Sequence, residues 1–291
     1  MRLTVRVPAT VANLGPGFDS FGLALSLHNE IAIDTEAEPG VVVEGEGADE
    51  LPTDESNLVF RAMRALAADA TLELPPFRMA CTNRIPLERG LGSSAAAGVG
   101  GLLLANHLFD SGVRSDELLR IAAGLEGHAD NAGAALRGGA TITYLHHDRW
   151  SVERLEPSNA LRPVALIPEA ERVGTEEARR ALPPTVVRED ATFDAARAAL
   201  LALALTDRPH LLPIALEDRL HQDARLELAP SAKELFHRLR EGGIPVCVAG
   251  SGPTLVAFDS DEAGEVPDPG PGWSVFRLEV DRRGADVMEA G

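Results

Sequence analysis

The sequence contains very little lysine, few aromatic residues and a deficit of basic charge. Among 291 residues the one lysine is Lys233, and aromatic residues make up 4%. The 27 basic residues face 45 acidic ones, which gives a formal net charge of −18. This balance argues against a nucleic acid or an anionic membrane as the main partner. Because lysine is nearly absent, a phosphate site would have to use arginine, backbone N–H groups or a metal.

Cysteines and long apolar runs are also scarce. Cys81 and Cys247 both lie in apolar, strand-like segments, which predicts buried thiols and neither a disulfide nor a metal site. The longest uncharged stretch, residues 90–109, contains five glycines, so it is a poor membrane span. Residues 1–7 alternate polar and apolar side chains, which indicates a strand and not a secretory signal. We therefore expect a cytoplasmic protein without a membrane partner.

Length and periodicity predict two domains of mixed α/β (α+β) structure. With 291 residues and 45% hydrophobic content, the chain can form two cores of ordinary size. Apolar residues at helical spacing predict an amphipathic helix over residues 57–70, with Ser56 as its cap. We expect domains over residues 1–150 and 151–291. Strands are predicted at residues 3–7, 31–34, 41–43, 77–82, 141–144, 164–167, 245–249, 254–258 and 275–278, and later helices near residues 176–181, 191–205 and 231–241.

The segment Ile85–Ala97 is a candidate phosphate-binding loop between a strand and a helix. Gly90 and Gly92 would let the backbone approach a ligand, and the positive end of the following helix suits a phosphate. The segment has no Walker lysine and does not match G-x-G-x-x-G. On glycine content alone, the favoured interpretation is a tight turn in which Ser93 caps the helix.

Two further segments carry polar residues in places typical of binding sites. Residues 8–19 follow the first strand with a loop that contains Asn13 and Asp19, and such loops often hold binding residues. Residues 125–131, Leu-Glu-Gly-His-Ala-Asp-Asn, gather two carboxylates, an imidazole and an amide between two predicted helices. The whole cluster, set among alanines and leucines, favours a functional site over a solvated turn.

These segments together resemble the GHMP kinases, and within them the homoserine kinases. The loop over residues 86–96 is similar to the phosphate-binding motif of the superfamily. Residues 8–19, 126–131, 218–222 (Asp-Arg-Leu-His-Gln) and 250–254 (Gly-Ser-Gly-Pro-Thr) are similar to homoserine kinase segments and occur in the same order. The resemblance extends from the first strand to about residue 258.

The resemblance implies a fold, a nucleotide site and a substrate. It implies an N-terminal domain like the second domain of ribosomal protein S5 and a ferredoxin-like C-terminal domain. L-homoserine would lie in the cleft between the two domains. A homodimer is compatible with the resemblance. ATP would bind the glycine loop through Pro86, Leu87, Glu88, Arg89, Gly90, Leu91, Gly92, Ser93, Ser94, Ala95 and Ala96.

The resemblance also implies roles for single residues. Thr175 and Arg179 would lie at the reacting hydroxyl and phosphoryl groups, and Arg225 would hold the substrate carboxylate. Glu126, with Ser93 or Ser94, would bind Mg²⁺. The remaining substrate ligands implied are Asn13, Asp19, His128 and Asp130.

The chemistry of homoserine agrees with this set. Its ammonium needs oxygen acceptors, its carboxylate needs a cation such as Arg225, and phosphoryl transfer needs a charge stabiliser such as Arg179. In mevalonate kinase relatives an aspartate that can act as a base occupies the position of Asn131. A neutral amide is a poor proton acceptor. We therefore expect Asn131 to belong to the catalytic site without acting as a base, and we expect no dedicated base in the reaction. Asp194, after Phe193, stands where asparagine is common.

Three other functions are compatible with parts of the sequence. A GHMP kinase for mevalonate or shikimate would bind a substrate that has a carboxylate but no ammonium. A pocket with the two aspartates Asp19 and Asp130 favours an amino acid over these substrates. A catalytically silent ligand-binding protein would not need Glu126, Ser94 and Arg179. An RNA-binding protein of the S5 type is disfavoured by the net charge of −18.

Overall fold

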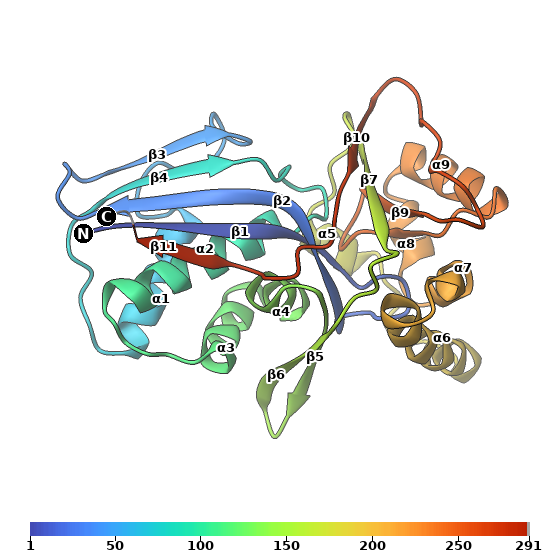
Figure 1. Ribbon diagram of the computed structural model, residues 1–291, viewed down its shortest axis with the longest axis horizontal. Helices are drawn as coiled ribbons and strands as arrows, with labels where there is room; N and C mark the ends of the chain where they lie inside the picture. Colours follow the sequence, from blue (N-terminus) through green and yellow to red (C-terminus); the bar gives the residue numbers. More distant parts are fainter. Residues whose placement is uncertain (290–291) are drawn as a thin grey trace.

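The computed structural model describes residues 1–289 and contains two β-sheets side by side (Figure 1). The first sheet follows the order β11-β1-β2-β4-β3, and the hairpin of β5 and β6 joins it through β2. All pairs in this sheet are antiparallel except β3 with β4. Its strands are β1 (Arg2–Ala12), β2 (Phe21–Asp34), β3 (Gly40–Gly45), β4 (Arg78–Asn83), β5 (Ala140–His146), β6 (Arg149–Leu155) and β11 (Asp286–Glu289).

Four helices cover one face of the first sheet (Figure 1). The alternate residues Leu3, Val5 and Val7 of β1 are fully buried, as expected for a strand with one face against helices. Gly101 allows α1 and α2 to pack closely, because a Cβ there would lie 2.4 Å from the carbonyl oxygen of Val59. The helices are α1 (Leu58–Asp69), α2 (Ser93–Leu108), α3 (Ser115–Glu126) and α4 (Asp130–Arg137).

The second sheet is antiparallel, in the order β10-β7-β9-β8, and has helices on both faces. Alternate residues divide between two cores: Val164 and Leu166 face α5, α8 and α9, whereas Ala165 and Ile167 join the core that includes α6 and α7. Its elements are β7 (Arg162–Pro168), α5 (Thr175–Arg180), α6 (Arg188–Thr206), η1 (Pro209–Leu211), α7 (Leu212–Ala215), α8 (Gln222–Leu226), α9 (Pro230–Glu241), β8 (Val246–Val248), β9 (Leu255–Asp259) and β10 (Trp273–Arg277).

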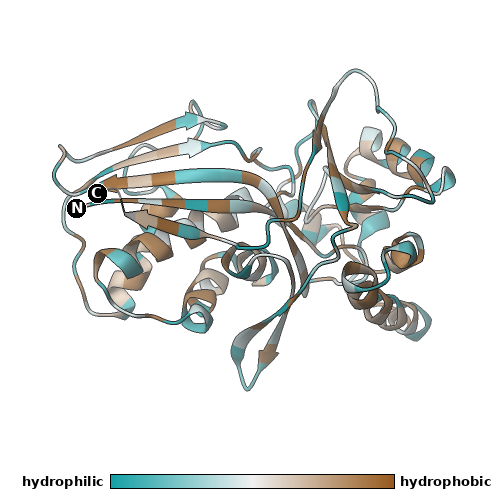
Figure 2. Cartoon of the chain, viewed as in Figure 1, coloured by the Kyte–Doolittle hydropathy of each residue, from teal (hydrophilic) through white to brown (hydrophobic). Residues whose placement is uncertain are grey.

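The predicted mixed α/β fold is confirmed, with differences in detail. Hydrophobic residues concentrate where helices face the sheets, as the patterning required (Figure 2). Strand β11, near the end of the described chain, was not predicted and pairs with β1. The predicted boundary near Trp150 falls inside β6, which still pairs with β5 of the first sheet. The division into two domains stays a prediction. Along the chain, the last residue of β6 in the first sheet is Leu155 and the first residue of β7 in the second sheet is Arg162.

Two local predictions of helix capping were wrong. Helix α1 is capped by Asn57 and not by Ser56, because the Asn57 side chain accepts a hydrogen bond from the backbone N–H of Val59 at 3.0 Å. Helix α2 begins at Ser93 after Gly92, which is left-handed with a φ of 71°, and no side chain caps it. The first N–H groups of α2 are therefore not satisfied by a serine cap.

The predicted thiols are buried and no disulfide joins them. Cys81 and Cys247 are free, and burial raises the pKa of Cys81 to about 11 and that of Cys247 to about 12. Such thiols stay protonated and unreactive at neutral pH. Over residues 1–289, none of the helices combines the length and the apolar character needed to cross a membrane.

Candidate active site

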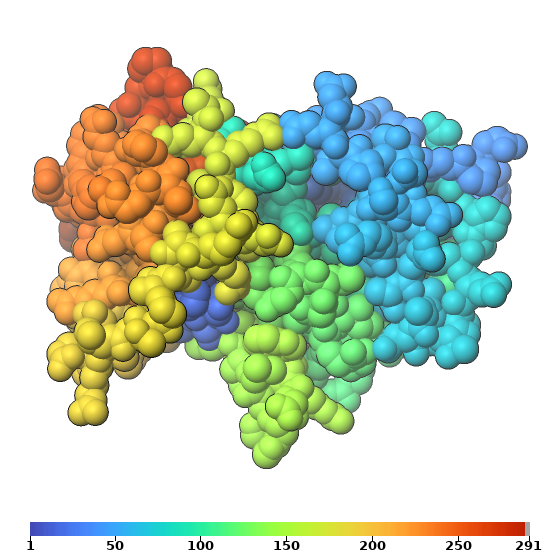
Figure 3. Space-filling view, turned by 180° about the vertical axis from the view of Figure 1, so that it is seen from behind, coloured from blue at the N-terminus to red at the C-terminus, as the bar shows by residue number. Residues whose placement is uncertain are grey.

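A cavity of about 370 Å³ lies between the glycine loop, the first strand and the start of the second sheet. The space-filling view is hollowed where the yellow segment that contains α5 meets the blue and teal part of the chain (Figure 3). Most of the predicted site residues line this cavity: Asn13, Asp19, Pro86, Glu88, Arg89, Gly90, Leu91, Gly92, Ser93, Ser94, Ala95, Glu126, His128, Asp130, Asn131, Thr175, Arg179 and Arg225.

Two predicted nucleotide residues lie elsewhere. Ala96 is fully buried in the hydrophobic core, because α2 turns its side chain toward the first sheet and away from the cavity. Leu87 lines an adjoining cavity of about 440 Å³ between the loop before α1 and the start of α2. The two cavities share Glu88, Ser93 and Ser94, so they meet at the N-terminus of α2.

The glycine loop has the shape of a phosphate cradle. Gly90 and Gly92 have φ values of 76° and 71°, a region that side chains disfavour. A Cβ on Gly90 would lie 2.0 Å from the carbonyl oxygen of Ala249, and one on Gly92 would lie 2.1 Å from Thr10 Oγ1. The loop thus fits tightly between the first strand and the second sheet, and it delivers the N-terminus of α2, with its positive dipole end, to the cavity wall.

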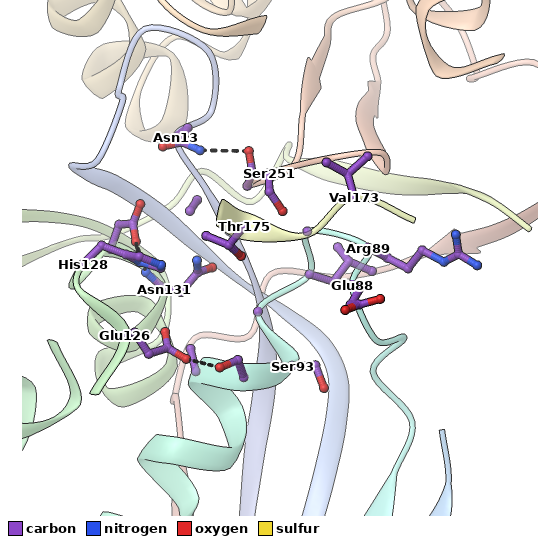
Figure 4. Close-up of a pocket in the computed structure, with 18 of the residues that line it drawn as sticks. Asn13, Glu88, Arg89, Ser93, Glu126, His128, Asn131, Val173, Thr175 and Ser251 are labelled. Atoms are coloured by element: carbon purple, nitrogen blue, oxygen red, sulfur yellow. Dashed lines mark hydrogen bonds and ion pairs between the residues drawn. The ribbon is translucent and has the colours of Figure 1, made fainter. Parts of the chain in front are cut away.

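Arg89 of the same loop takes a different direction from its neighbours. Its side chain extends away from the other labelled residues and donates from Nη2 to the carbonyl oxygen of Glu169 at 2.8 Å (Figure 4). Nη1 is buried without a partner, and burial lowers the pKa of Arg89. Arg89 therefore links the glycine loop to the end of β7.

Glu126 and Ser94 form the oxygen-rich corner of the cavity. Ser94 Oγ donates a hydrogen bond to Glu126 Oε1, across the start of α2 and the end of α3 (Figure 4). Burial raises the pKa of Glu126, although the hydrogen bond from Ser94 acts in the opposite direction. Within residues 1–289 no cluster of three or more metal-ligating side chains occurs, so a cation here would need oxygens from its ligand as well.

His128 and Asp130 form a hydrogen-bonded pair at the start of α4. His128 Nδ1 lies 2.8 Å from Asp130 Oδ1, and the same oxygen accepts the backbone N–H of Asn131 at 2.8 Å. Burial lowers the pKa of His128, but the hydrogen bond and charge of Asp130 and the charge of Glu126 outweigh burial and raise it overall. The pair therefore offers the cavity an imidazole whose protonated form is favoured by the neighbouring carboxyl groups.

Asn131 is held by the first strand. Its Oδ1 accepts a hydrogen bond from Thr10 Oγ1 at 2.8 Å. A Cβ added at Gly92 would lie 3.1 Å from the same oxygen, so Asn131 borders the glycine loop. The carbonyl side of the amide is therefore engaged by protein, and the amide nitrogen is the group left for a ligand.

Asn13 and Asp19 lie on the loop after β1, and both have positive φ values, 72° and 51°. Asn13 Oδ1 accepts the backbone N–H of Asp19 at 3.0 Å, and Asn13 Nδ2 donates to the carbonyl oxygen of Gly250 at 3.0 Å. Asp19 in turn accepts two hydrogen bonds from Arg179 of α5, at 2.8 and 3.1 Å. The predicted substrate ligand and the predicted charge stabiliser are thus paired with each other.

Arg225 lies in the deepest wall of the cavity and is only 4% exposed. Its Nη1 donates to the carbonyl oxygen of Gly250 and to Nδ1 of His221, the latter at 3.1 Å. The guanidinium carbon lies 5.3 Å from the ring centre of Phe18, and Nε is buried without a partner. Burial lowers the pKa of Arg225 to about 10, which keeps it cationic at neutral pH.

The structure adds residues that were not predicted to line the cavity. Gly250 and Ser251 close it opposite the glycine loop, and Val173 lies beside Thr175 (Figure 4). The segment 250–254 carried a signal in its Gly-Ser-Gly-Pro-Thr sequence, but Val173 carried none. Ala12 and Leu125 complete the lining.

Comparison with known proteins places the fold and this site in a known class. Residues 57–139, which include the glycine loop and α2, match the model of the GHMP kinases N terminal domain. This segment therefore belongs to the GHMP kinase class, as the resemblance predicted, and kinases of this class are phosphotransferases that use ATP.

Relatives with curated names narrow the class. Homoserine kinase of Streptomyces coelicolor is 44% identical over 98% of this chain and 94% of its own length. Homoserine kinase of Clavibacter michiganensis is 42% identical over 99% of this chain and 94% of its own length. The crystal structure of homoserine kinase from Cytophaga hutchinsonii superimposes with a TM-score of 0.84 at 26% identity, over 99% and 97% of the two chains. The chain belongs to the homoserine kinase family.

Proposed function

We propose that the chain transfers the γ-phosphoryl group of ATP to the side-chain hydroxyl of L-homoserine in the cytoplasm, forming O-phospho-L-homoserine for threonine biosynthesis. The observation that carries this proposal is one cavity lined by the N-terminus of α2, by the buried guanidinium of Arg225 and by the carboxylates of Asp19 and Asp130. An anion site, a carboxylate site and acceptors for an ammonium are what this substrate pair requires.

The nucleotide would occupy both adjoining cavities. Its phosphates suit the glycine loop and the start of α2, and its nucleoside suits the second cavity, which is lined by apolar side chains such as Leu51, Leu58 and Val59. The shared residues Ser93 and Ser94 lie where the two parts of the ligand would join.

The residues at the corner of Glu126 and Ser94 fit Mg²⁺. A half-buried carboxylate with a raised pKa, bonded to a hydroxyl, gains from a cation that replaces lost solvation. Two protein oxygens leave positions for phosphate and water oxygens, as Mg²⁺ prefers. When bound, Mg²⁺ would neutralise charge on the phosphates and help to align them.

Homoserine would bind through its charged groups at the opposite end. Arg225 would hold the carboxylate, and Asn13, Asp19, Asp130 and His128 would surround the ammonium and orient the molecule. The hydroxyl would then point toward Thr175 and Arg179, beside the glycine loop. Arg179 must then give up at least one of its two hydrogen bonds to Asp19 and donate to the transferring phosphoryl group.

Proton removal needs no dedicated base in this proposal. The amide of Asn131 cannot accept a proton usefully, and its oxygen is occupied by Thr10. Positioning and charge stabilisation supply most of the rate in phosphoryl transfer. The proton of the homoserine hydroxyl would leave to a phosphoryl oxygen or to solvent as the new bond forms.

A substrate panel with coupled detection of ADP tests the proposal. We expect ADP formation with L-homoserine and Mg²⁺-ATP, and little with mevalonate or shikimate, which lack an ammonium. ADP formation with mevalonate or shikimate in place of homoserine would assign another small-molecule kinase. Tight ligand binding without ADP would assign a silent binding protein.

A further inference from the structure

Asp218 organises the turn that leads into α8, outside the cavity. Its Oδ1 accepts the backbone N–H of Leu220 at 3.0 Å, and its Oδ2 accepts those of His221 and Gln222 at 3.0 and 2.7 Å. The side chain of Asp218 is fully buried. A buried carboxylate with three N–H donors holds the backbone of residues 218–222 in one conformation.

A second carboxyl group, Asp194 of α6, meets the same turn. Asp194 is 3% exposed, and its Oδ1 accepts the backbone N–H of Arg219 at 3.0 Å. Its Oδ2 is buried without a hydrogen-bond partner among the described residues, and the nearby carboxyl of Asp218 accepts the next N–H groups of the same turn. Two carboxylates cannot bond each other unless one of them carries a proton. A proton on Asp194 Oδ2, donated to Asp218, satisfies the orphaned oxygen.

The turn is connected to the cavity by two contacts in series. His221 Nε2 donates to the carbonyl oxygen of Gly15 at 2.8 Å, and His221 Nδ1 accepts from Arg225 at 3.1 Å. Burial lowers the pKa of His221 to about 4, so the ring is neutral at physiological pH and Nδ1 is free to accept. The orientation of Arg225 therefore depends on where Asp218 holds the backbone of His221.

We propose that Asp194 and Asp218 share one proton and act as a positioning pair for Arg225, so that affinity for the substrate carboxylate depends on the protonation of Asp194. This proposal rests on the assignment of Arg225 to the carboxylate of homoserine. Loss of the shared proton would put two buried negative charges beside each other, loosen the turn and release His221 from its contact with Arg225.

The cations nearest the pair are engaged with other partners. Within the described residues, no arginine or lysine forms an ion pair with Asp194 or Asp218. Arg197 and Arg240 are both paired with Glu217, and Arg219 is paired with Asp190. The charged and titratable groups that face the pair from the neighbouring elements are Asp190, Arg219, His221, Arg225 and Cys247.

Titration of the pair falls in an accessible pH range. Burial, with the hydrogen bond and charge of Asp218, raises the pKa of Asp194 to about 7. Burial also acts to raise the pKa of Asp218, but the hydrogen bond of Asp194 and the backbone N–H groups of His221 and Gln222 help to hold it below its usual range. Since the native state keeps a proton that the unfolded chain loses near pH 4, stability from this proton is full in acid and is lost as pH rises through about 7.

The variant Asp194→Asn tests the proposal, because its amide N–H replaces the shared proton at every pH. Between about pH 6 and pH 8, we expect the KM of the wild-type protein for homoserine to rise about tenfold more than the KM of Asp194→Asn does. The kcat of the wild type should change far less. Asp207→Asn, which removes an exposed carboxylate at the end of α6, is the matched control and should keep the wild-type pH profile.

Thermal unfolding without substrate separates this proposal from the proposed function. The midpoint of wild type should fall relative to that of Asp194→Asn as the pH rises from about 4 to about 7 and run parallel to it above that range, whatever the substrate is. Parallel KM and unfolding profiles for the two proteins would overturn the shared proton. A difference in unfolding profile with no difference in KM would overturn the link to Arg225 and leave the carboxyl pair as a structural device.

Discussion

Arg179 and Asp19 face each other across the cavity and form a two-point ion pair, with Nη2–Oδ1 and Nη1–Oδ2 distances of 2.8 and 3.1 Å. The two residues come from α5, beside the second sheet, and from the loop after β1. Both side chains are more than one third exposed, so the pair is screened by solvent and can exchange partners readily. A ligand that offers an ammonium to Asp19 and a phosphoryl group to Arg179 would replace the ion pair with two contacts of the same kind.

Arg179→Ala should reduce kcat far more than Asn131→Ala. Arg179 would lose a charge contact with the transferring phosphoryl, which contributes on the order of 10³-fold in comparable arginine clamps. Asn131→Ala would lose only the hydrogen bond from Thr10, since we propose no base at this position. Both variants should be compared at saturating homoserine and ATP, so that the difference reports turnover.

The matched control for Arg179 is Arg180→Ala, the neighbouring arginine that is 77% exposed and paired only with Glu176. It should retain wild-type kcat. If Asn131→Ala proves as slow as Arg179→Ala, and Asn131→Asp exceeds the wild type, position 131 takes part in proton transfer and the base-free mechanism is wrong.

Arg225→Ala should raise the KM for homoserine strongly. Removal of a buried partner for the substrate carboxylate costs about 2–4 kcal/mol of binding, and the loss also leaves Nδ1 of His221 without its donor. Arg225→Lys should recover little, because a lysine cannot serve two protein acceptors and a carboxylate in the same planar arrangement. Unchanged KM and kcat in Arg225→Ala would remove this residue from the binding site.

Gly92→Ala should weaken ATP binding and destabilise the protein, whereas Gly98→Ala should do neither. At Gly92 the φ of 71° and the 2.1 Å approach of a Cβ to Thr10 Oγ1 force the loop to move. At Gly98, in the same helix, a Cβ meets nothing within 4 Å, so alanine should stabilise α2 by roughly 0.5–1 kcal/mol. Calorimetric titration with nucleotide and denaturant unfolding measure both effects; equal nucleotide affinities in the two variants would put the phosphates elsewhere.

Glu126→Gln should raise the Mg²⁺ concentration needed for half-maximal activity. The neutral amide removes the charge that would bind the cation, and the contact with Ser94 can persist through the amide oxygen. As the solution is acidified, protonation of Glu126 should weaken Mg²⁺ binding. Because burial raises the pKa of Glu126, this loss should begin at a higher pH than it would for an ordinary glutamate. The variant should lack this pH dependence, and an unchanged Mg²⁺ requirement in Glu126→Gln would move the metal site.

The sequence alone determined the broad fold and the kind of ligand. Alternating residues such as Leu3, Val5 and Val7 predicted strands, because one face of a strand must be buried. The glycines of residues 90–92 allowed either a phosphate loop or a tight turn, since glycine readily adopts positive φ, and the resemblance to the GHMP kinases favoured the phosphate loop. The scarcity of lysine predicted that arginine and backbone groups would serve the anions, and Arg179 and Arg225 do line the cavity.

Only the tertiary structure decided which groups meet. Neither the pairing of Arg179 with Asp19, 160 residues apart, nor the contact of Thr10 with Asn131 follows from any local pattern, because both depend on how sheets and loops pack. Strand β11 was missed for the same reason, since its short and charged sequence gains its hydrogen bonds from β1. Asp194 also had no interpretable role in the sequence. Its buried position beside Asp218 gives it one, because a carboxyl group in that place must share a proton.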